Sequence, residues 1–388
     1  MDNSADTVPC TKKNCARGSL RVSCFSYCRG GPTMGMLVVE EPAHATPDAP
    51  ETDIMPAFGR GMCPKLVAEV QSAKRAVRVN ALEVLCDEFK NPASVVGCVD
   101  CGVVEVLNDQ AAGDPDPLTR LRASAALAHC ARDATGRRAM IAKNSAKAVK
   151  AALGDDENDV RGHVYEALIR VSSGSVAGVR SLIGANYAGL LVGKAAKEVV
   201  ALQPPALELL THCLYDPRGL ESALSHGAVK TTITLLSSFD AKVREKAAAC
   251  LAILCFAEEA KEAAIEGGAV PLLVDLMKDP DLASRSAAAA ALAAVTMTDE
   301  GKRRMVPAPD AAEVESVALL LALLREGDGP LATNVLKVVA NVAVHPKARN
   351  QLRTSADCLS LLDGIIAGDN ALNAKHAAIA KAAVLWEP

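Results

Sequence analysis

The pattern of hydrophobic and polar positions repeats along the chain with a period of about forty residues. In "VREKAAACLAIL" (243–254), and again in "ASRSAAAAALAAV" (283–295), a charged start leads into alanines and aliphatic residues. Both stretches predict a helix with very small side chains. The longer blocks around them begin with "GAV" at Gly227 and Gly268, which are 41 residues apart. We therefore treat each block as one copy of a structural repeat.

The same pattern extends in both directions when Arg244 is taken as the reference position. The equivalent positions are Arg78, Arg120, Arg161, Gln203, Arg244, Arg285, Ala332 and Ala374. The residues seven places further on are Leu85, Leu127, Leu168, Leu210, Leu251, Leu292, Val339 and Lys381. We predict that the apolar members of this second set are buried between stacked repeats, and that Lys381 belongs to a terminal repeat with a wet outer face.

Each unit reads as a short helix, a helix that begins near "GAV", a turn rich in Asp, Pro or Ser, and a long helix. Its period is typical of armadillo and HEAT repeats, and glycine at the sharp turn with Pro271 in a first helical turn favours armadillo. The sequence therefore predicts an all-α fold, an armadillo/HEAT-like right-handed superhelical solenoid of about eight repeats. We assign the array to residues 61–388 and an irregular Cys-, Pro- and Gly-containing extension to residues 1–60. The segment "VPAPDAAEVE" (306–315) is predicted to be a loop insertion.

Composition narrows the possible partners and compartment. The net charge of −4 gives no electrostatic reason to expect nucleic acid or an anionic membrane as a partner. No secretory segment opens the chain and no long uncharged apolar run occurs, so we expect an intracellular, reducing compartment. The thirteen cysteines include many at apolar helical positions, such as Cys86, Cys130, Cys250 and Cys255, where we expect them to act as small hydrophobic residues.

Candidate chemistry is sparse. The chain lacks the glycine-rich, zinc-protease and serine-hydrolase motifs, so we predict no enzyme and no cofactor. Four thiols lie close together in the extension and are weak candidates for a zinc site, although their spacing matches no common zinc motif and an irregular tail is the alternative. These candidates are Cys10, Cys15, Cys24 and Cys28. Cys98 and Cys101 form a lone C-x-x-C pair, a still weaker metal candidate.

Two further polar features have ordinary interpretations. The acidic run "DDEND" (155–159) precedes a long helix, where we expect helix capping and solvation. His129 and His212 fall on long helices, and we interpret both as solvated or partner-facing side chains.

The long helices are expected to line the concave face of the array. Peptide-binding armadillo proteins such as importins and catenins are similar to one another in carrying a Trp and an Asn there on successive repeats. Those places correspond to the fifth and ninth residues after our reference position, where this chain has no Trp and a single Asn, Asn341. We predict a partner-binding groove formed by Ala249, Ile253, Ala290, Ala294, Lys337, Asn341, Glu166, Arg170, Glu208 and His212.

The alanines in this set suggest the kind of partner. Small side chains allow close approach, which favours a packed helix or a folded subunit over an extended peptide. The alternative is that these alanines only fill a tightly curved interior.

Several short phrases resemble one particular family. "SHGAV", "TMTDEGK", "ATGRRAM" and the terminal "VLWEP" are similar to the armadillo-repeat subunit of the radial spoke of motile cilia and flagella, over about residues 62–388. The resemblance implies a non-enzymatic scaffold in the spoke stalk of the axoneme, which contributes to axoneme assembly and ciliary motility. It implies other radial spoke subunits as partners and no nucleic acid, membrane or small-molecule substrate. The alternatives are a generic armadillo adaptor and the armadillo portion of a U-box ubiquitin ligase, although residues 1–60 are short and polar for a U-box.

Overall fold

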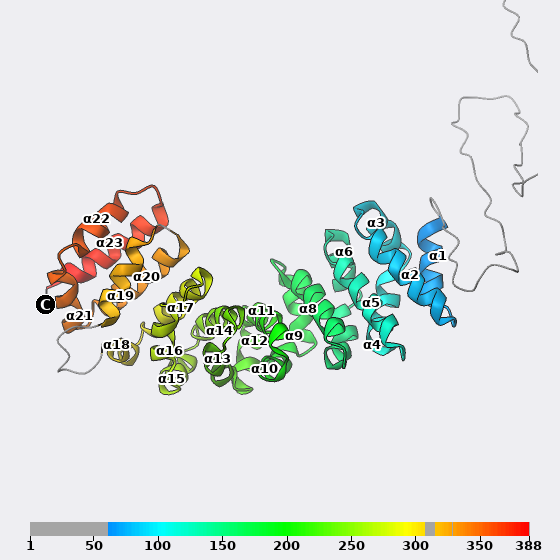
Figure 1. The fold of residues 1–388 in the computed structure, drawn as a ribbon, viewed down its shortest axis with the longest axis horizontal. Coiled ribbons are helices and arrows are strands. Elements are labelled where there is room, and N and C mark those ends of the chain that lie inside the picture. Colours follow the sequence, from blue (N-terminus) through cyan, green and yellow to red (C-terminus); the bar gives the residue numbers. More distant parts are fainter. Residues whose placement is uncertain (1–60, 307–314, 328, 388) are drawn as a thin grey trace, which may run out of the picture. The chain divides into compact units, whose positions relative to one another are not determined.

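The computed structural model describes residues 61–306, 315–327 and 329–387, and all the elements in these ranges are helical, with no strand among them (Figure 1). These residues belong to one compact unit that spans Glu51–Pro388. The insertion predicted at residues 306–315 lies between two helices, and its residues 307–314 fall outside the described ranges.

Eight long helices recur once per repeat and carry the reference positions. They are α2 (Arg75–Glu88), α5 (Pro117–Cys130), α8 (Asn158–Ser172), α11 (Gln203–Leu214), α14 (Ala241–Leu254), α17 (Leu282–Val295), α20 (Pro330–Val342) and α23 (Ala371–Leu385). Each packs directly against the next long helix along the chain. The prediction of about eight stacked helical repeats is confirmed.

A second helix precedes each long helix. This set comprises α1 (Met62–Val70), α4 (Val103–Gly113), α7 (Ser145–Ala148) with the 3₁₀ segment η2 (Val149–Gly154), α10 (Tyr187–Lys197), α13 (Ala228–Leu236), α16 (Ala269–Leu276), α19 (Glu315–Arg325) and α22 (Cys358–Ile366). The short 3₁₀ segment η3 (Val200–Leu202) leads into α11.

The remaining helix of each unit stands at its start, before the other two. It is present in every repeat after the first of those described. This set comprises α3 (Pro92–Asp100), α6 (Ala134–Ala142), α9 (Val176–Gly184), α12 (Pro217–Ser225), α15 (Glu258–Glu266), α18 (Asp299–Met305) and α21 (Pro346–Thr354). None of the described helices has both the length and the apolar composition needed to cross a membrane alone; α9 and α10 meet those criteria only as a pair, bent by 82°.

The turn between the first two helices of a unit needs a left-handed backbone. Gly227 and Gly268 adopt φ of 78° and 76° there, as the sharp turn at "GAV" predicts. In two earlier repeats Asn144 and Asn186 take this place, each with φ of 54°. Asparagine is among the few residues with a Cβ that tolerate this conformation, so the turn survives without glycine.

The residues predicted to form the core between repeats are buried. Leu85, Leu168, Leu210, Leu251, Leu292 and Val339 are 0% exposed, and Leu127 is 1% exposed. The prediction from the repeat register is confirmed. Lys381 in the last repeat is partly exposed and forms an ion pair with Asp363.

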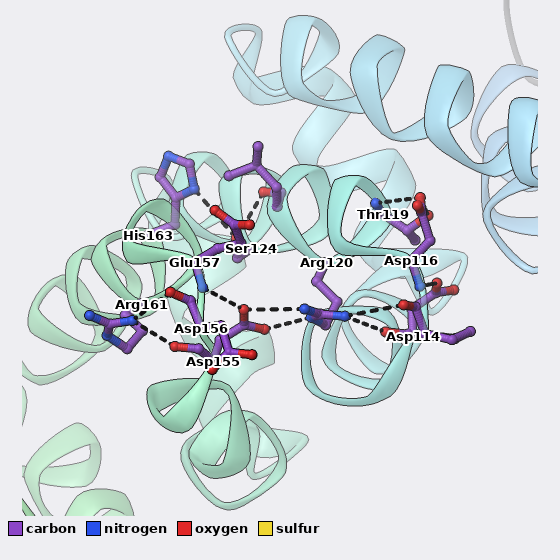
Figure 2. A network of polar contacts seen from close by, with 12 residues as sticks. Asp114, Asp116, Thr119, Arg120, Ser124, Asp155, Asp156, Glu157, Arg161 and His163 are labelled. Atoms are coloured by element: carbon purple, nitrogen blue, oxygen red, sulfur yellow. Dashed lines mark hydrogen bonds and ion pairs between the residues drawn. The ribbon is translucent and has the colours of Figure 1, made fainter.

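The reference arginines join neighbouring repeats, as Figure 2 shows for Arg120. Its guanidinium donates to the carbonyl oxygen of Asp114 at 3.0 Å, in the turn before its own helix, and to both carboxylate oxygens of Asp155 at 2.5 and 3.3 Å, in the next repeat. Arg161 repeats this arrangement with the carbonyl of Asp155 at 2.6 Å and the carboxylate of Glu198 at 3.0 Å. Each guanidinium thus links the turn before its own long helix to the corresponding turn of the next repeat.

This network adds a role for the first residue of the acidic run 155–159. Asp155 forms a nearly buried ion pair with Arg120, its side chain being 5% exposed. The residue that caps α8 is Glu157, which makes no side-chain capping bond. Residues 156–159 are exposed and Asp159 lies in the first turn of α8, so solvation and a carboxylate near the helix start hold for the rest of the run.

Candidate partner-binding surface

On the repeats that contain α2, α5 and α8, charged side chains bridge the exposed face of the long helices. The carboxylate of Glu83 on α2 forms an ion pair with Arg122 of α5 at 2.6 Å. The carboxylate of Glu166 on α8 forms ion pairs with Arg132 at 3.3 Å and with Arg170 at 3.0 Å. Burial acts to raise the pKa of Glu166, but the hydrogen bonds from these two arginines outweigh it and lower the pKa. Glu166 and Arg170 also line a hollow of about 530 Å³.

The histidines on this face bond to the repeat before them. His129 Nδ1 lies 3.0 Å from the carbonyl oxygen of Cys86, and His212 Nδ1 lies 2.8 Å from Ser172 Oγ. Both side chains are half-buried, and burial lowers the pKa of His212. Each histidine thus takes part in a contact between repeats, and since both stay partly exposed, their interpretation as solvated or partner-facing stays a prediction.

The face changes character over α14, α17 and α20. Ala249, Ile253, Ala290 and Ala294 lie partly exposed in successive repeats, and we call these four residues the floor. A groove of about 1000 Å³ includes Ala249, Ile253 and Ala290, and an adjoining hollow of about 450 Å³ includes Ile253, Ala290 and Ala294. Because the two hollows share lining residues, they form one continuous apolar depression.

The remaining predicted residues continue these rows on the flanking helices. Lys337 and Asn341 on α20 line the smaller hollow beside the floor. Glu208 and His212 occupy the equivalent places on α11, where Glu208 pairs with Lys246 at 3.0 Å. The amide nitrogen of Asn341 donates to the carbonyl oxygen of Ala293 at 2.9 Å and to Thr296 Oγ1 at 3.1 Å. That amide group is thus occupied within the chain.

A row of exposed apolar side chains borders the floor, and the sequence analysis missed it. Each member lies twelve residues after a reference position, in the turn that follows a long helix. The row, which we call the rim, consists of Tyr215, Phe256, Met297, Val344 and Trp386, which are 66, 70, 63, 55 and 54% exposed. The corresponding residues of the first three repeats are Lys90, Arg132 and Ser173. Counting twelve positions from the reference would have revealed this change from polar to apolar residues.

Comparison with known proteins places the array among solved folds. An engineered protein superimposes with a TM-score of 0.62 at 22% identity, covering 84% of this chain and 90% of that one. A designed armadillo repeat protein gives a TM-score of 0.55 at 20% identity, covering 60% of this chain and 99% of that one. The chain has the armadillo-repeat fold. Another designed armadillo repeat protein, solved with the peptide (KR)4, gives a TM-score of 0.55 at 19% identity and the same coverage.

The sequence comparison points to one kind of natural armadillo protein. The chain is 32% identical over 127 residues to radial spoke protein 14 of Chlamydomonas reinhardtii, and this match covers 32% of each protein. The resemblance to an armadillo radial spoke subunit is confirmed. The chain spans about a third of the length of this curated relative. No family model matches the chain.

Metal ligation finds no support in the part of the armadillo array that the structure describes, which holds no group of three or more His, Cys, Asp or Glu residues placed for a metal ion. The candidates Cys10, Cys15, Cys24 and Cys28 lie outside the described residues. Cys98 is buried, and burial raises the pKa of its thiol. Burial likewise raises the pKa of Cys250 to about 12, which suits a packing role because only the thiolate is reactive.

Proposed function

We propose that this chain is a non-enzymatic scaffold subunit of the radial spoke, held in the spoke stalk by contacts with other spoke subunits. Its place would be the axoneme of a cilium or flagellum, where it contributes to axoneme assembly and motility. The similarity to radial spoke protein 14 carries this proposal. Since the match covers about a third of each protein, the role of the whole relative is transferred as a proposal.

The chemistry of the armadillo array supports a scaffold that acts through protein contacts. Neighbouring repeats are joined by buried ion pairs such as Arg161–Glu198, while the floor and the rim leave apolar side chains on the surface. Contiguous exposed apolar side chains usually mark protein interaction sites. Nucleic acid, membranes and small-molecule substrates are not part of the proposal, and neither is a cofactor.

Axoneme fractionation tests this role. In ciliated cells that make a tagged copy of the chain, cilia are isolated and the membrane is removed with a non-ionic detergent. We expect the chain to remain with the axonemes, and tomography to place the tag on the spoke stalk. Recovery in the detergent-soluble fraction would instead indicate a generic adaptor, and ubiquitin transfer by the pure chain would contradict a non-enzymatic scaffold.

A further inference from the structure

Four successive long helices present matching rows of side chains on one face. In the row five residues after the reference position, Glu208 and Lys337 stand at the two ends and alanines occupy the middle. In the row nine residues after it, His212 and Asn341 enclose Ile253 and Ala294. Of the rim, Tyr215 lines the groove, and Phe256 and Met297 line the adjoining hollow. A strip with an apolar centre and polar ends thus crosses α11, α14, α17 and α20.

The large side chains around the strip are exposed to a degree that packing within the chain does not explain. Leu282, at the start of α17, lines the groove and is 58% exposed. Five of the thirteen large hydrophobic side chains exposed in the described residues belong to the rim. An apolar partner that covers them would remove this surface from water, at about 25 cal/mol for each Å² buried.

The floor does not suit an extended peptide. An extended chain leaves its backbone N–H and C=O groups to be satisfied by the receptor. The amide nitrogens of the two asparagines on α20 are already engaged, because Asn341 Nδ2 donates to Ala293 O and Thr296 Oγ1, and Asn334 Nδ2 donates to the carbonyl oxygen of Ser286 at 3.2 Å. A helix satisfies its own backbone, so an alanine floor can accept it without such donors.

Charges along the strip indicate the polar groups of the partner. Glu245, Asp281 and Glu326 line the groove where the long helices begin, together with one cation, Arg285, which pairs with Glu326 at 2.9 Å. Three acids against one arginine leave this edge with an excess of negative charge. Lys337 lies at the α20 end, where the structure gives it no ion pair with any described residue. A complementary partner has basic residues along the edge that meets the three acids and an acidic residue at the end that meets Lys337.

From these features we infer that the strip is the docking site for an amphipathic helix of a partner protein. Neighbouring long helices lie about 8–10 Å apart, so the three steps from α11 to α20 span about 24–30 Å. At 1.5 Å per residue this corresponds to a helix of roughly 16–20 residues. The helix carries a large aliphatic or aromatic stripe, a basic edge and an acidic end. The inference does not depend on the axonemal role, since it concerns the chemistry of the pure chain.

Binding to defined peptides tests this site. The probe is a synthetic helix of about 18 residues with a leucine stripe, lysines along one edge of the stripe and glutamates at the C-terminal end. A matched peptide has lysines in place of those glutamates. Both peptides are titrated against the full chain by fluorescence anisotropy. The first should bind about fivefold more tightly than the second, which corresponds to a difference in binding free energy of roughly 1 kcal/mol. The variant Lys337→Glu should reverse this order.

Two substitutions separate docking from folding. Ala290→Glu places a carboxylate in the floor, where a bound helix would bury it unpaired, and we expect at least about tenfold weaker binding with an unchanged circular dichroism spectrum. Ala263→Glu on α15, which is exposed and lies away from the groove lining, should leave binding unchanged.

Three results would overturn the inference. One is tighter binding of an extended (KR)4 peptide than of the helix. Another is equal binding of the helix to the folded Ala290→Glu variant. The third is a concentration-dependent dimer that this variant abolishes, because it would assign the strip to a second copy of the chain.

Discussion

The repeats around α2, α5 and α8 and those around α14, α17 and α20 share one architecture but present opposite surfaces. At equivalent places, Arg122 bridges to Glu83 at 2.6 Å in the first region, whereas Ala287 and Ala249 line an open groove in the second. Charged bridges satisfy the first surface within the chain, while the second leaves apolar area uncovered. The difference locates the surface most suited to a partner.

Comparison of the two regions also distinguishes the residues that determine the fold from those that determine the contacts with a partner. Leu85 in the first region and Leu251 in the second are both 0% exposed. The core position is therefore maintained across a complete change of surface. In a stacked array each repeat needs the same apolar contact with its neighbour, whereas its outer face is unconstrained by folding. Binding properties can therefore vary from repeat to repeat.

A large effect is expected from breaking a buried ion pair in the first region. The side chains of Arg161 and Glu198 are 11% and 3% exposed. In Arg161→Met the carboxylate of Glu198 stays buried without its main partner, although Lys194 at 3.5 Å and the Tyr165 hydroxyl at 3.2 Å remain. We expect the free energy of unfolding, measured by urea denaturation, to fall by about 3 kcal/mol.

Two matched variants show whether burial is the cause. The double variant Arg161→Met with Glu198→Met removes both charges and should recover most of the loss. The second region holds both kinds of pair, because Arg244–Asp279 is 19% and 6% exposed, whereas Arg285–Glu326 is 21% and 43% exposed. Arg285→Met should therefore cost about 1 kcal/mol or less. Equal losses for Arg161→Met and Arg285→Met would contradict burial of the carboxylate as the cause.

Core truncation should affect both regions alike. Leu85→Ala and Leu251→Ala each remove a fully buried side chain, and we expect each to lower the free energy of unfolding by about 2–5 kcal/mol. Leu282→Ala makes the same chemical change at a 58% exposed position and should cost about 0.5 kcal/mol or less. A large loss for Leu282→Ala would mean that the groove is part of the folding core.

The sequence predicted the fold because the core residues recur at a fixed place in each repeat. The repeat period, and the place of Leu251 and its equivalents within each repeat, can be counted directly along the sequence. The role of Arg161 was missed, although its recurrence was the signal, because its acidic partner lies 37 residues away in another turn. Similarly, Asn341 matches the place of a peptide clamp, and only the structure reveals that its amide group bonds the preceding helix.

The candidate surface was predicted in part. The floor residues follow from helical spacing on α14 and α17, and the structure places them along one groove. The rim lies in turns beyond the helix ends, where helical periodicity gives no information. Its exposure depends on how the next repeat leaves Phe256 and Met297 uncovered, which requires the three-dimensional arrangement.

The smallest expected effect is a pH dependence confined to the histidine-bearing helices. Burial lowers the pKa of His212 in the folded chain, against an opposing effect of Glu208 and a weaker lowering by Lys246. Because the unfolded chain has the ordinary pKa of about 6.5, it binds more protons than the folded chain as the pH falls through that range. The stabilisation from neutral His212 is thus complete above about pH 6.5 and is lost as the pH falls toward the lower folded pKa. His163 on α8, whose pKa burial also lowers, acts in the same direction.

Amide hydrogen exchange, corrected for intrinsic rates, would locate this effect. Between about pH 7.5 and pH 5.5, protection in α8 and α11 should fall relative to α17, whose floor residues Ala290 and Ala294 do not titrate. His212→Gln should remove the pH dependence of α11 and leave α17 as it was. The paired carboxylates do not enter this window, since those with lowered pKa values, such as Asp155, lose their contribution only below about pH 4. Equal loss of protection in α11 and α17 would show that both helices are destabilised together as the pH falls. The two regions would then not differ in their pH dependence.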